Sequence, residues 1–190
     1  MERAEMIKKL KDKLTEKRFV HSVGVEYTAS CMAFLYGADM KKARIAGLLH
    51  DCAKCIPTEE KLIKAEKFGL HVNSSERANP DLLHGKLGAY YARTKYGIND
   101  KEILDAITYH TTGRPGMTLM DKIIYVADYI EPNRRMLNEL PEIRKEAFQD
   151  IDKALLHILK NILVYLESQS CEIDEMTEKT YYYYCSNNKK

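Results

Sequence analysis

The sequence predicts an all-α protein that folds as a single domain. Almost every segment repeats apolar residues at the spacing of an amphipathic helix, and no segment shows the alternation of a half-buried strand bounded by turns. The chain has 190 residues, a length that suits one domain with a sizeable core. We therefore expect one helical bundle.

The helices can be bounded in order along the chain. The first carries Met6, Leu10 and Leu14 at intervals of four residues. The later helices are expected over 18–36, 40–53, 56–69, 79–97, 99–110, 118–131 and 141–168. Their ends coincide with helix start and stop signals at Gly37, Asp39, Pro57, Gly69, Gly97, Asn99 or Asp100, and Pro132. The stretch 111–117, TTGRPGM, is rich in glycine and proline and is expected to be a loop.

Composition argues against several functions. The formal net charge is only +2, so no global basic surface for nucleic acid is expected. The apolar runs are too short to cross a membrane, and the charged N-terminal stretch lacks the apolar core of a signal peptide. We expect a cytoplasmic protein with reduced cysteines. The CxxC pair Cys52 and Cys55 lacks a βαβ context and two further zinc ligands, so we interpret it as helix packing.

The C-terminal stretch TYYYYCSNNKK contains four consecutive tyrosines, which cannot all face one side of a helix. We interpret this stretch as an arm that packs on the body of the protein or on a second subunit. A homodimer is compatible with a small helical protein of this kind, although no apolar stripe identifies its interface.

Titratable residues lie on the apolar faces of the predicted helices. His50 lies four residues after Ala46, inside AGLLHDCAKC, and Asp51 follows it. Equivalent inward positions on other helices hold His21, His84, His110 and Asp128. One buried histidine is most often a hydrogen-bonded core residue, but a carboxylate in an apolar stripe is costly unless it is paired or binds a metal. Ion pairs with Lys54 or Arg134 would explain a carboxylate but not four histidines, so the set favours a metal centre.

The same residues resemble a known signature. His21, the pair His50 and Asp51, and Asp128 resemble the H…HD…D pattern of the HD-domain metal-dependent phosphohydrolases. The surrounding stretches look more specifically like the motifs of YqeK-type HD proteins, the bacterial symmetrical bis(5′-nucleosyl)-tetraphosphatases, in RFVHSVGV, GLLHDCAK, LLHGKLGA, YHTTGRPGM and KIIYVADYIEPNR. The resemblance covers roughly residues 1–170 and leaves the tail 171–190 outside it.

This resemblance implies a fold, a reaction and a cofactor. It implies an HD-domain bundle over 1–170 with a metal centre in its core, and symmetrical hydrolysis of a dinucleoside polyphosphate, diadenosine tetraphosphate, to two ADP molecules. It also implies iron, although mixed nitrogen and oxygen ligands suit manganese, cobalt, nickel or zinc as well. The primary metal would be bound by His21, His50, Asp51 and Asp128. His84 and His110 match the additional histidines of the two-metal subgroup, and either complete a second metal site or act on the phosphates.

A substrate with several negative charges needs cations and donors near the metal. Four residues lie beside a predicted ligand, within one helical turn of it or just after its helix, and are predicted to bind substrate: Arg18, Lys54, Thr111 and Arg134. Arg114 and Arg135 are interpreted as solvated surface charges. Asp51, with His84 and His110, is the predicted catalytic group, and no serine or cysteine nucleophile is expected.

Other functions remain open at this point. The same ligands would serve a phosphohydrolase that acts on a nucleoside monophosphate, a cyclic dinucleotide or a guanosine alarmone. A nucleotide sensor with little turnover and a diiron oxygenase are further alternatives. Only the motifs around the ligands favour the dinucleoside tetraphosphate.

Overall fold

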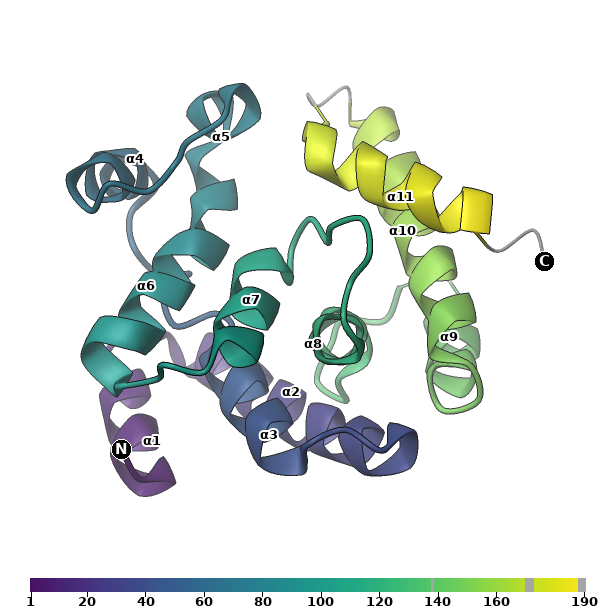
Figure 1. Ribbon diagram of the computed structural model, residues 1–190, viewed down its shortest axis with the longest axis horizontal. Coiled ribbons are helices and arrows are strands. Elements are labelled where there is room, and N and C mark those ends of the chain that lie inside the picture. The colour runs from purple at the N-terminus through teal and green to yellow at the C-terminus, as the bar shows by residue number, and fades with distance from the viewer. Residues whose placement is uncertain (138, 170–172, 188–190) are drawn as a thin grey trace.

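Helix α8 (Leu119–Ile130) lies in the middle of the bundle, in contact with the helices that we label α2, α3, α7, α9 and α10 (Figure 1). It is apolar on nearly every side, and a helix of that composition is stable only when it is buried. The computed structural model describes residues 1–137, 139–169 and 173–187, and Cys171 lies outside these ranges. Helices and loops, without a strand, make up these described ranges, so the predicted all-α class is confirmed.

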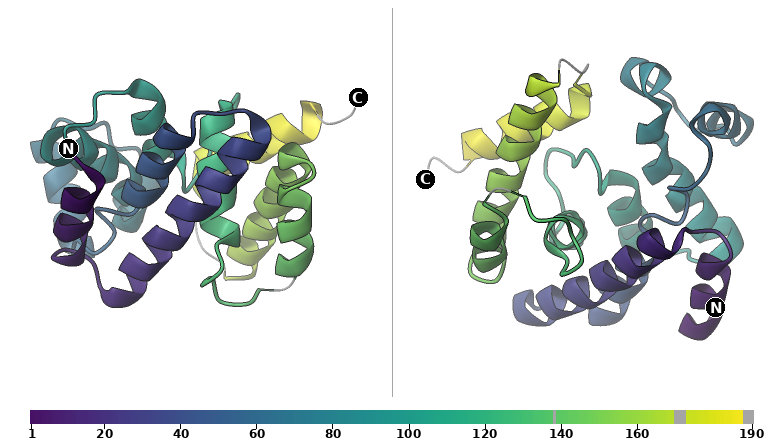
Figure 2. Two further views of the ribbon diagram at one scale, coloured as in Figure 1. Left: turned by 90° about the horizontal axis from the view of Figure 1, so that it is seen from below. Right: turned by 180° about the vertical axis from the view of Figure 1, so that it is seen from behind.

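The remaining helices, apart from α1, which packs on α2, form three groups. Their bounds are α1 (Arg3–Lys11), α2 (Glu16–Tyr36), α3 (Met40–Leu49), α4 (Thr58–Lys67), α5 (Ser74–Ala78), the 3-10 helix η1 (Pro80–Leu83), α6 (His84–Tyr96), α7 (Lys101–Tyr109), α9 (Leu140–Ala147), α10 (Ile151–Ser168) and α11 (Glu175–Asn187). Helices α2 and α3 form one group, α4 to α7 a second, and α9 to α11 lie on the opposite side of α8 from α6 (Figure 2). In the part of the chain that the structure describes, no helix is both long and apolar enough to cross a membrane.

The helix predicted over 40–53 ends earlier, at Leu49. The next backbone N–H groups donate to carbonyls three residues back, from Cys52 to Leu49 and from Lys54 to Asp51. Such tight turns replace the α-helical pattern of hydrogen bonds. The apolar period continued past the true end, which is why the sequence overestimated the length of this helix.

Two further predictions of a single helix were wrong. The segment 79–97 contains a 3-10 turn, η1, before α6 begins at His84, and the short α5 precedes it. The segment 141–168 is broken between α9 and α10, because Asp150 adopts an extended conformation and its carboxylate accepts from two N–H groups of α10. The boundaries predicted for 18–36 and 118–131 are confirmed within two residues, as is the loop at 111–117.

The tyrosine-rich stretch packs on the body of the protein as helix α11. Thr180 is fully buried against the loop 111–117, where Gly113 has a φ of 65° and a Cβ would meet Thr180 Cγ2 at 2.7 Å. The Tyr184 hydroxyl accepts a 2.9 Å hydrogen bond from the buried N–H of Met117. One face of α11 therefore fixes the loop, while Tyr182 points outward and is 63% exposed.

The hydrogen bond between α11 and the loop can be tested by removing one hydroxyl. In Tyr184→Phe the Met117 N–H loses its acceptor, and an unpaired buried donor costs about 1–3 kcal/mol. We expect the free energy of unfolding, measured by urea denaturation, to fall by that amount. The matched variant Tyr182→Phe should stay within about 0.5 kcal/mol of the parent protein. Equal urea midpoints for the two variants would contradict this packing.

Candidate metal centre

Ligand atoms from five parts of the bundle converge beside α8. They belong to His21 of α2, His50 and Asp51 after α3, His84 at the start of α6, His110 after α7, and Asp128 of α8. Their ligand atoms form three groups, each within 4.8 Å: His21, His50 and Asp51; His50, His110 and Asp128; Asp51, His84 and His110. The structure thus brings together all six residues that the sequence singled out as metal ligands or catalytic groups.

The histidines are oriented by hydrogen bonds on the far side of each ring. Nδ1 of His50, His84 and His110 each donates to the carbonyl oxygen three residues earlier in the chain. His50 and His110 directly follow α3 and α7, where the last carbonyls of a helix lack intrahelical partners. Because a carbonyl can only accept, these bonds place the ring proton on Nδ1. The lone pair of each Nε2 then faces the centre of the cluster.

His21 is oriented by a residue that the sequence analysis missed. Its Nδ1 lies 3.1 Å from Oε1 of Glu131, which is only 1% exposed. The other carboxylate oxygen of Glu131 accepts from the backbone N–H and the side-chain amide of Asn133. A carboxylate behind a histidine in this way fixes the orientation of a metal ligand. Glu131 was visible in the motif ADYIEPNR, but only its position behind His21 reveals its role.

Some inward atoms of the cluster lack hydrogen-bond partners in the protein. Among the buried atoms of the described ranges that make no hydrogen bond, three belong to the cluster: His21 Nε2, His50 Nε2 and Asp51 Oδ1. His21 Nε2 lies 2.9 Å from Asp128 Oδ1, and two lone pairs at that distance repel unless a proton or a metal cation lies between them. Imidazole nitrogens with carboxylate oxygens are ligands of first-row transition metals. The donor set therefore fits a metal ion.

The electrostatics keep both carboxylates ionised. Burial would raise the pKa of each, but the surrounding imidazoles hold the pKa of Asp51 well below its usual range. His21 and the guanidinium of Arg134, among other neighbours, lower the pKa of Asp128 in the same way. Both side chains are thus available as anionic ligands at neutral pH.

His84 and His110 face each other across a short gap. Their Nε2 atoms lie 3.1 Å apart, and the Thr111 hydroxyl lies 3.0 Å from the first and 3.2 Å from the second. Burial, reinforced by His110 and Lys54, lowers the pKa of His84 to about 3, so its ring is neutral. Two ring nitrogens at this distance need a shared cation or hydrogen-bond donor between them. Thr111, which the sequence analysis predicted to bind substrate, thus lies beside the cluster.

The predicted substrate-binding cations also lie at the cluster. Arg18 Nη1 is 2.6 Å from Asp51 Oδ2, and Arg134 Nη1 is 3.5 Å from Asp128 Oδ1. Lys54 Nζ lies 3.3 Å from His84 Nε2, and burial lowers the pKa of this ammonium. Three positive side chains thus border the ligand atoms, which is the arrangement that an anionic substrate requires.

A cavity of about 420 Å³ opens over the ligand atoms, and we call it the catalytic cavity. Its floor and rim contain Arg18, Asp51, Lys54, His84, His110, Thr111, Asp128 and Arg134. The other lining residues, which we call the wall of this cavity, were not singled out as site residues by the sequence analysis: Asn79, Leu82, Tyr125, Tyr129, Ile162, Tyr165, Leu166, Asp174 and Thr177. The Asn73 amide donates to Asp174 at 3.3 Å, which links α5 with the start of α11 beside this wall.

Comparison with known proteins identifies the family. A family model described as "HD domain" matches residues 18–133, a range that contains all six clustered residues. The chain belongs to the HD-domain family.

Several HD-domain relatives cover nearly the whole chain. A Bacillus subtilis (strain 168) protein named "Bis(5′-nucleosyl)-tetraphosphatase, symmetrical" is 46% identical, covering 95% of this chain and 96% of that protein. A protein of the same name from Staphylococcus aureus (strain NCTC 8325 / PS 47) is 36% identical over 92% and 90%. A crystal structure of a "predicted HD superfamily hydrolase involved in NAD metabolism" from Clostridium acetobutylicum has a TM-score of 0.95 and 40% identity, covering 98% of both chains.

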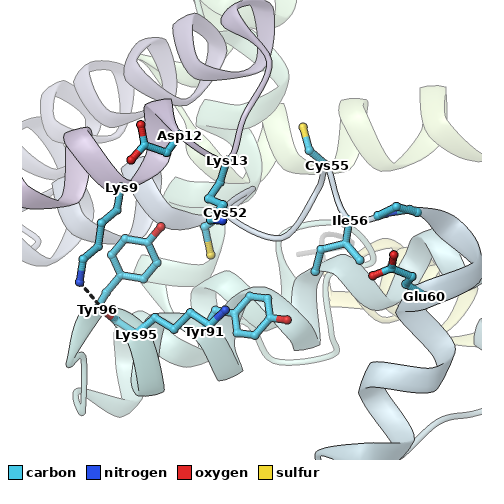
Figure 3. Close-up of a pocket in the computed structure, with 11 residues that line it drawn as sticks. Lys9, Asp12, Lys13, Cys52, Cys55, Ile56, Glu60, Tyr91, Lys95 and Tyr96 are labelled. Carbon is cyan, nitrogen blue, oxygen red and sulfur yellow. Dashed lines mark hydrogen bonds between the residues drawn. The ribbon is translucent and has the colours of Figure 1, made fainter.

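The CxxC pair lines a different cavity from the clustered histidines and aspartates. Cys52 and Cys55 line a separate cavity of about 660 Å³ with residues of α1 and α6, and no member of the clustered ligand set lines it (Figure 3). The Cys52 thiol donates to the Gly88 carbonyl, and burial raises its pKa to about 12. Such a thiol is a poor nucleophile and a poor metal ligand, which agrees with its interpretation as helix packing.

The role of Glu131 can be tested by changing one atom. In Glu131→Gln an amide N–H can donate to His21 Nδ1 and shift the ring proton to Nε2, where it would block metal binding. We expect metal affinity, measured by competition with a chelator, to fall about tenfold to a hundredfold, as for other residues that orient metal ligands. The exposed residue Glu142 offers a control, and Glu142→Gln should leave the affinity unchanged. An unaltered metal affinity in Glu131→Gln would contradict the role of Glu131 in orienting His21.

Proposed function

We propose that this chain hydrolyses diadenosine tetraphosphate symmetrically, with a metal-activated water, to two molecules of ADP. The observation that carries the proposal is the set of four histidines whose Nδ1 atoms are engaged and whose Nε2 atoms face two carboxylates. The names of relatives that are 36–46% identical over most of the chain support the choice of substrate.

The metal ligands that we propose are the six clustered residues. His21, His50, Asp51 and Asp128 would hold the primary ion, and Asp51, His84 and His110 the second. We propose iron, with manganese, cobalt, nickel or zinc as substitutes for the same nitrogen and oxygen donors. Bound there, the metal would activate water at neutral pH and neutralise charge on the phosphoryl oxygens.

The chain's own cations would hold the tetraphosphate over the cluster. Arg18 and Arg134 present planar guanidinium groups that match phosphate oxygens, and Lys54 adds a positive charge beside His84. Water adds to one of the two central phosphorus atoms, and the anhydride oxygen leaves with the other ADP. Because water itself attacks the phosphorus, no serine or cysteine intermediate is required, and these side chains bind both products as anions. We further propose that the enzyme acts in the cytoplasm on this small molecule and not on nucleic acid or a membrane.

A product assay tests the function directly. The protein is purified under low oxygen, its metal content is measured, and the nucleotides formed from diadenosine tetraphosphate are resolved. We expect ADP as the sole nucleotide product, because the central anhydride is cleaved. Asp51→Ala should lose bound metal and activity while its helical circular dichroism persists. ATP with AMP as products would refute symmetrical cleavage, and no turnover by metal-loaded protein would refute this substrate.

Tyr125 offers a second test inside the catalytic cavity. Its side chain lines the cavity one helical turn before Asp128, and it is 3% exposed. Its hydroxyl makes no hydrogen bond to any residue in the described ranges. We propose that this hydroxyl donates to a phosphate oxygen of the substrate.

In Tyr125→Phe we expect kcat/KM to fall about tenfold or more, because a hydrogen bond to a charged group contributes ~1.5–3 kcal/mol. The melting temperature should stay equal or rise, since an unpaired buried hydroxyl is removed. A lost structural contact would instead lower it. The exposed residue Tyr27 supplies the control, and Tyr27→Phe should leave both quantities unchanged. A normal kcat/KM in Tyr125→Phe would exclude this contact.

A further inference from the structure

We propose that the two ADP halves of the substrate bind in two different cavities that meet at Arg18 and Arg134. One half lies in the catalytic cavity. The other lies in a neighbouring cavity, which we call the basic groove, of about 510 Å³. The groove is lined by Glu16, Lys17, Arg18, Val20, His21, Glu131, Asn133, Arg134 and Arg135. This inference rests on the proposed function.

The two cavities share a boundary at the metal ligands. Arg18 and Arg134 line both cavities, and they lie 2.6 Å from Asp51 and 3.5 Å from Asp128 respectively. His21 lines the basic groove, whereas the two aspartates line the catalytic cavity. A phosphate chain held by both arginines would therefore pass over the ligand cluster from one cavity into the other.

Symmetrical cleavage requires this arrangement of the substrate. The bond that breaks is the middle one, so it must lie at the metal ligands, and an equal half of the molecule must extend in each direction. Each half carries two phosphates and a nucleoside, which need space and positive charge. Both cavities have volumes within the range of small-molecule sites, about 300–1,000 Å³.

The charge of the basic groove suits the second half. Lys17 and Arg135 are exposed there, beyond the two shared arginines, and Glu16 is the one exposed acid among the lining residues. Glu131 adds little to the surface potential, because it is 1% exposed and is engaged by His21 and Asn133. The sequence analysis interpreted Arg135 as a solvated charge, and its position in the groove now points to a phosphate contact.

The two cavities differ in how they can bind a nucleoside. The wall of the catalytic cavity offers the rings of Tyr129 and Tyr165 and the apolar side chains of Ile162 and Leu166. Rings of this kind stack on nucleobases. Among the residues that line the basic groove, Val20 is the one aliphatic side chain. The catalytic cavity therefore selects the first base, and the basic groove holds the second half mainly through its phosphates.

The stoichiometry of ADP binding tests the proposal without turnover. Calorimetric titration of the metal-loaded full chain with ADP, under low oxygen, should show two ADP molecules bound per chain. The double variant Lys17→Glu with Arg135→Glu should bind one. Arg93 and Lys145 are exposed and line neither the catalytic cavity nor the basic groove. Their double replacement by Glu is the matched control and should bind two.

Binding of one ADP per chain by the parent protein would overturn the proposal. Binding of two ADP molecules per chain by the Lys17→Glu and Arg135→Glu double variant would also overturn it. If that variant does not fold, the stoichiometry of the parent protein still decides. In kinetics, the variant should raise KM for diadenosine tetraphosphate about tenfold or more through lost phosphate contacts. The control variant should keep the KM of the parent protein. An equal KM in the test variant and the control variant would overturn the proposal that the basic groove binds substrate.

The same measurements separate this proposal from the proposed function. Two bound ADP molecules, without formation of ADP from diadenosine tetraphosphate, would refute the function and leave both cavities in place. Formation of ADP by a protein that binds one ADP would support the function and refute the second cavity.

Discussion

Two carboxylates and four imidazoles share one small volume, and the bundle is built around the problem of keeping them there. Buried anions are strongly unfavourable unless positive charge lies beside them. Arg18 and Arg134 supply part of that charge at Asp51 and Asp128. The inward nitrogen and oxygen atoms of the cluster face one another with their lone pairs, and a bound cation would remove that repulsion. Arg18, Arg134 and Lys54 also face any substrate with several phosphates that enters the catalytic cavity.

Helix ends, more than helix faces, position the ligands. His50 and His110 lie directly after α3 and α7, and each ring donates to a carbonyl that the ending helix leaves without a partner. Each bond satisfies the backbone and selects the ring tautomer at once. A histidine in mid-helix has no free carbonyl three residues back, since that oxygen already accepts within the helix. The early end of α3 is therefore part of how the site is made.

Helical period identified most of the fold and every clustered ligand, because both depend on local spacing. The spacing of apolar residues gave wrong or missing predictions where a cap or a contact between distant residues determines the structure. The break at Asp150 depends on a cap, and a continuous apolar period conceals it. Glu131 gained its role from His21, which is 110 positions away in the chain. The part of the cavity wall formed by Tyr165 and Thr177 depends on how α10 and α11 pack on the rest of the bundle. The spacing of apolar residues within either helix does not predict that packing.

The position of His21 finally depends on how closely two helices approach. Gly24, one turn after His21 on α2, has no side chain, and a Cβ there would clash with Glu131 Oε2. Glu131 directly follows α8, so the close contact brings the end of α8 against α2 and places Glu131 Oε1 behind the ring of His21. Asp128, one turn earlier on α8, then faces the other nitrogen of the same ring. The spacing of two backbones thus sets both partners of one imidazole, and the site is as rigid as the packing of α2 on α8.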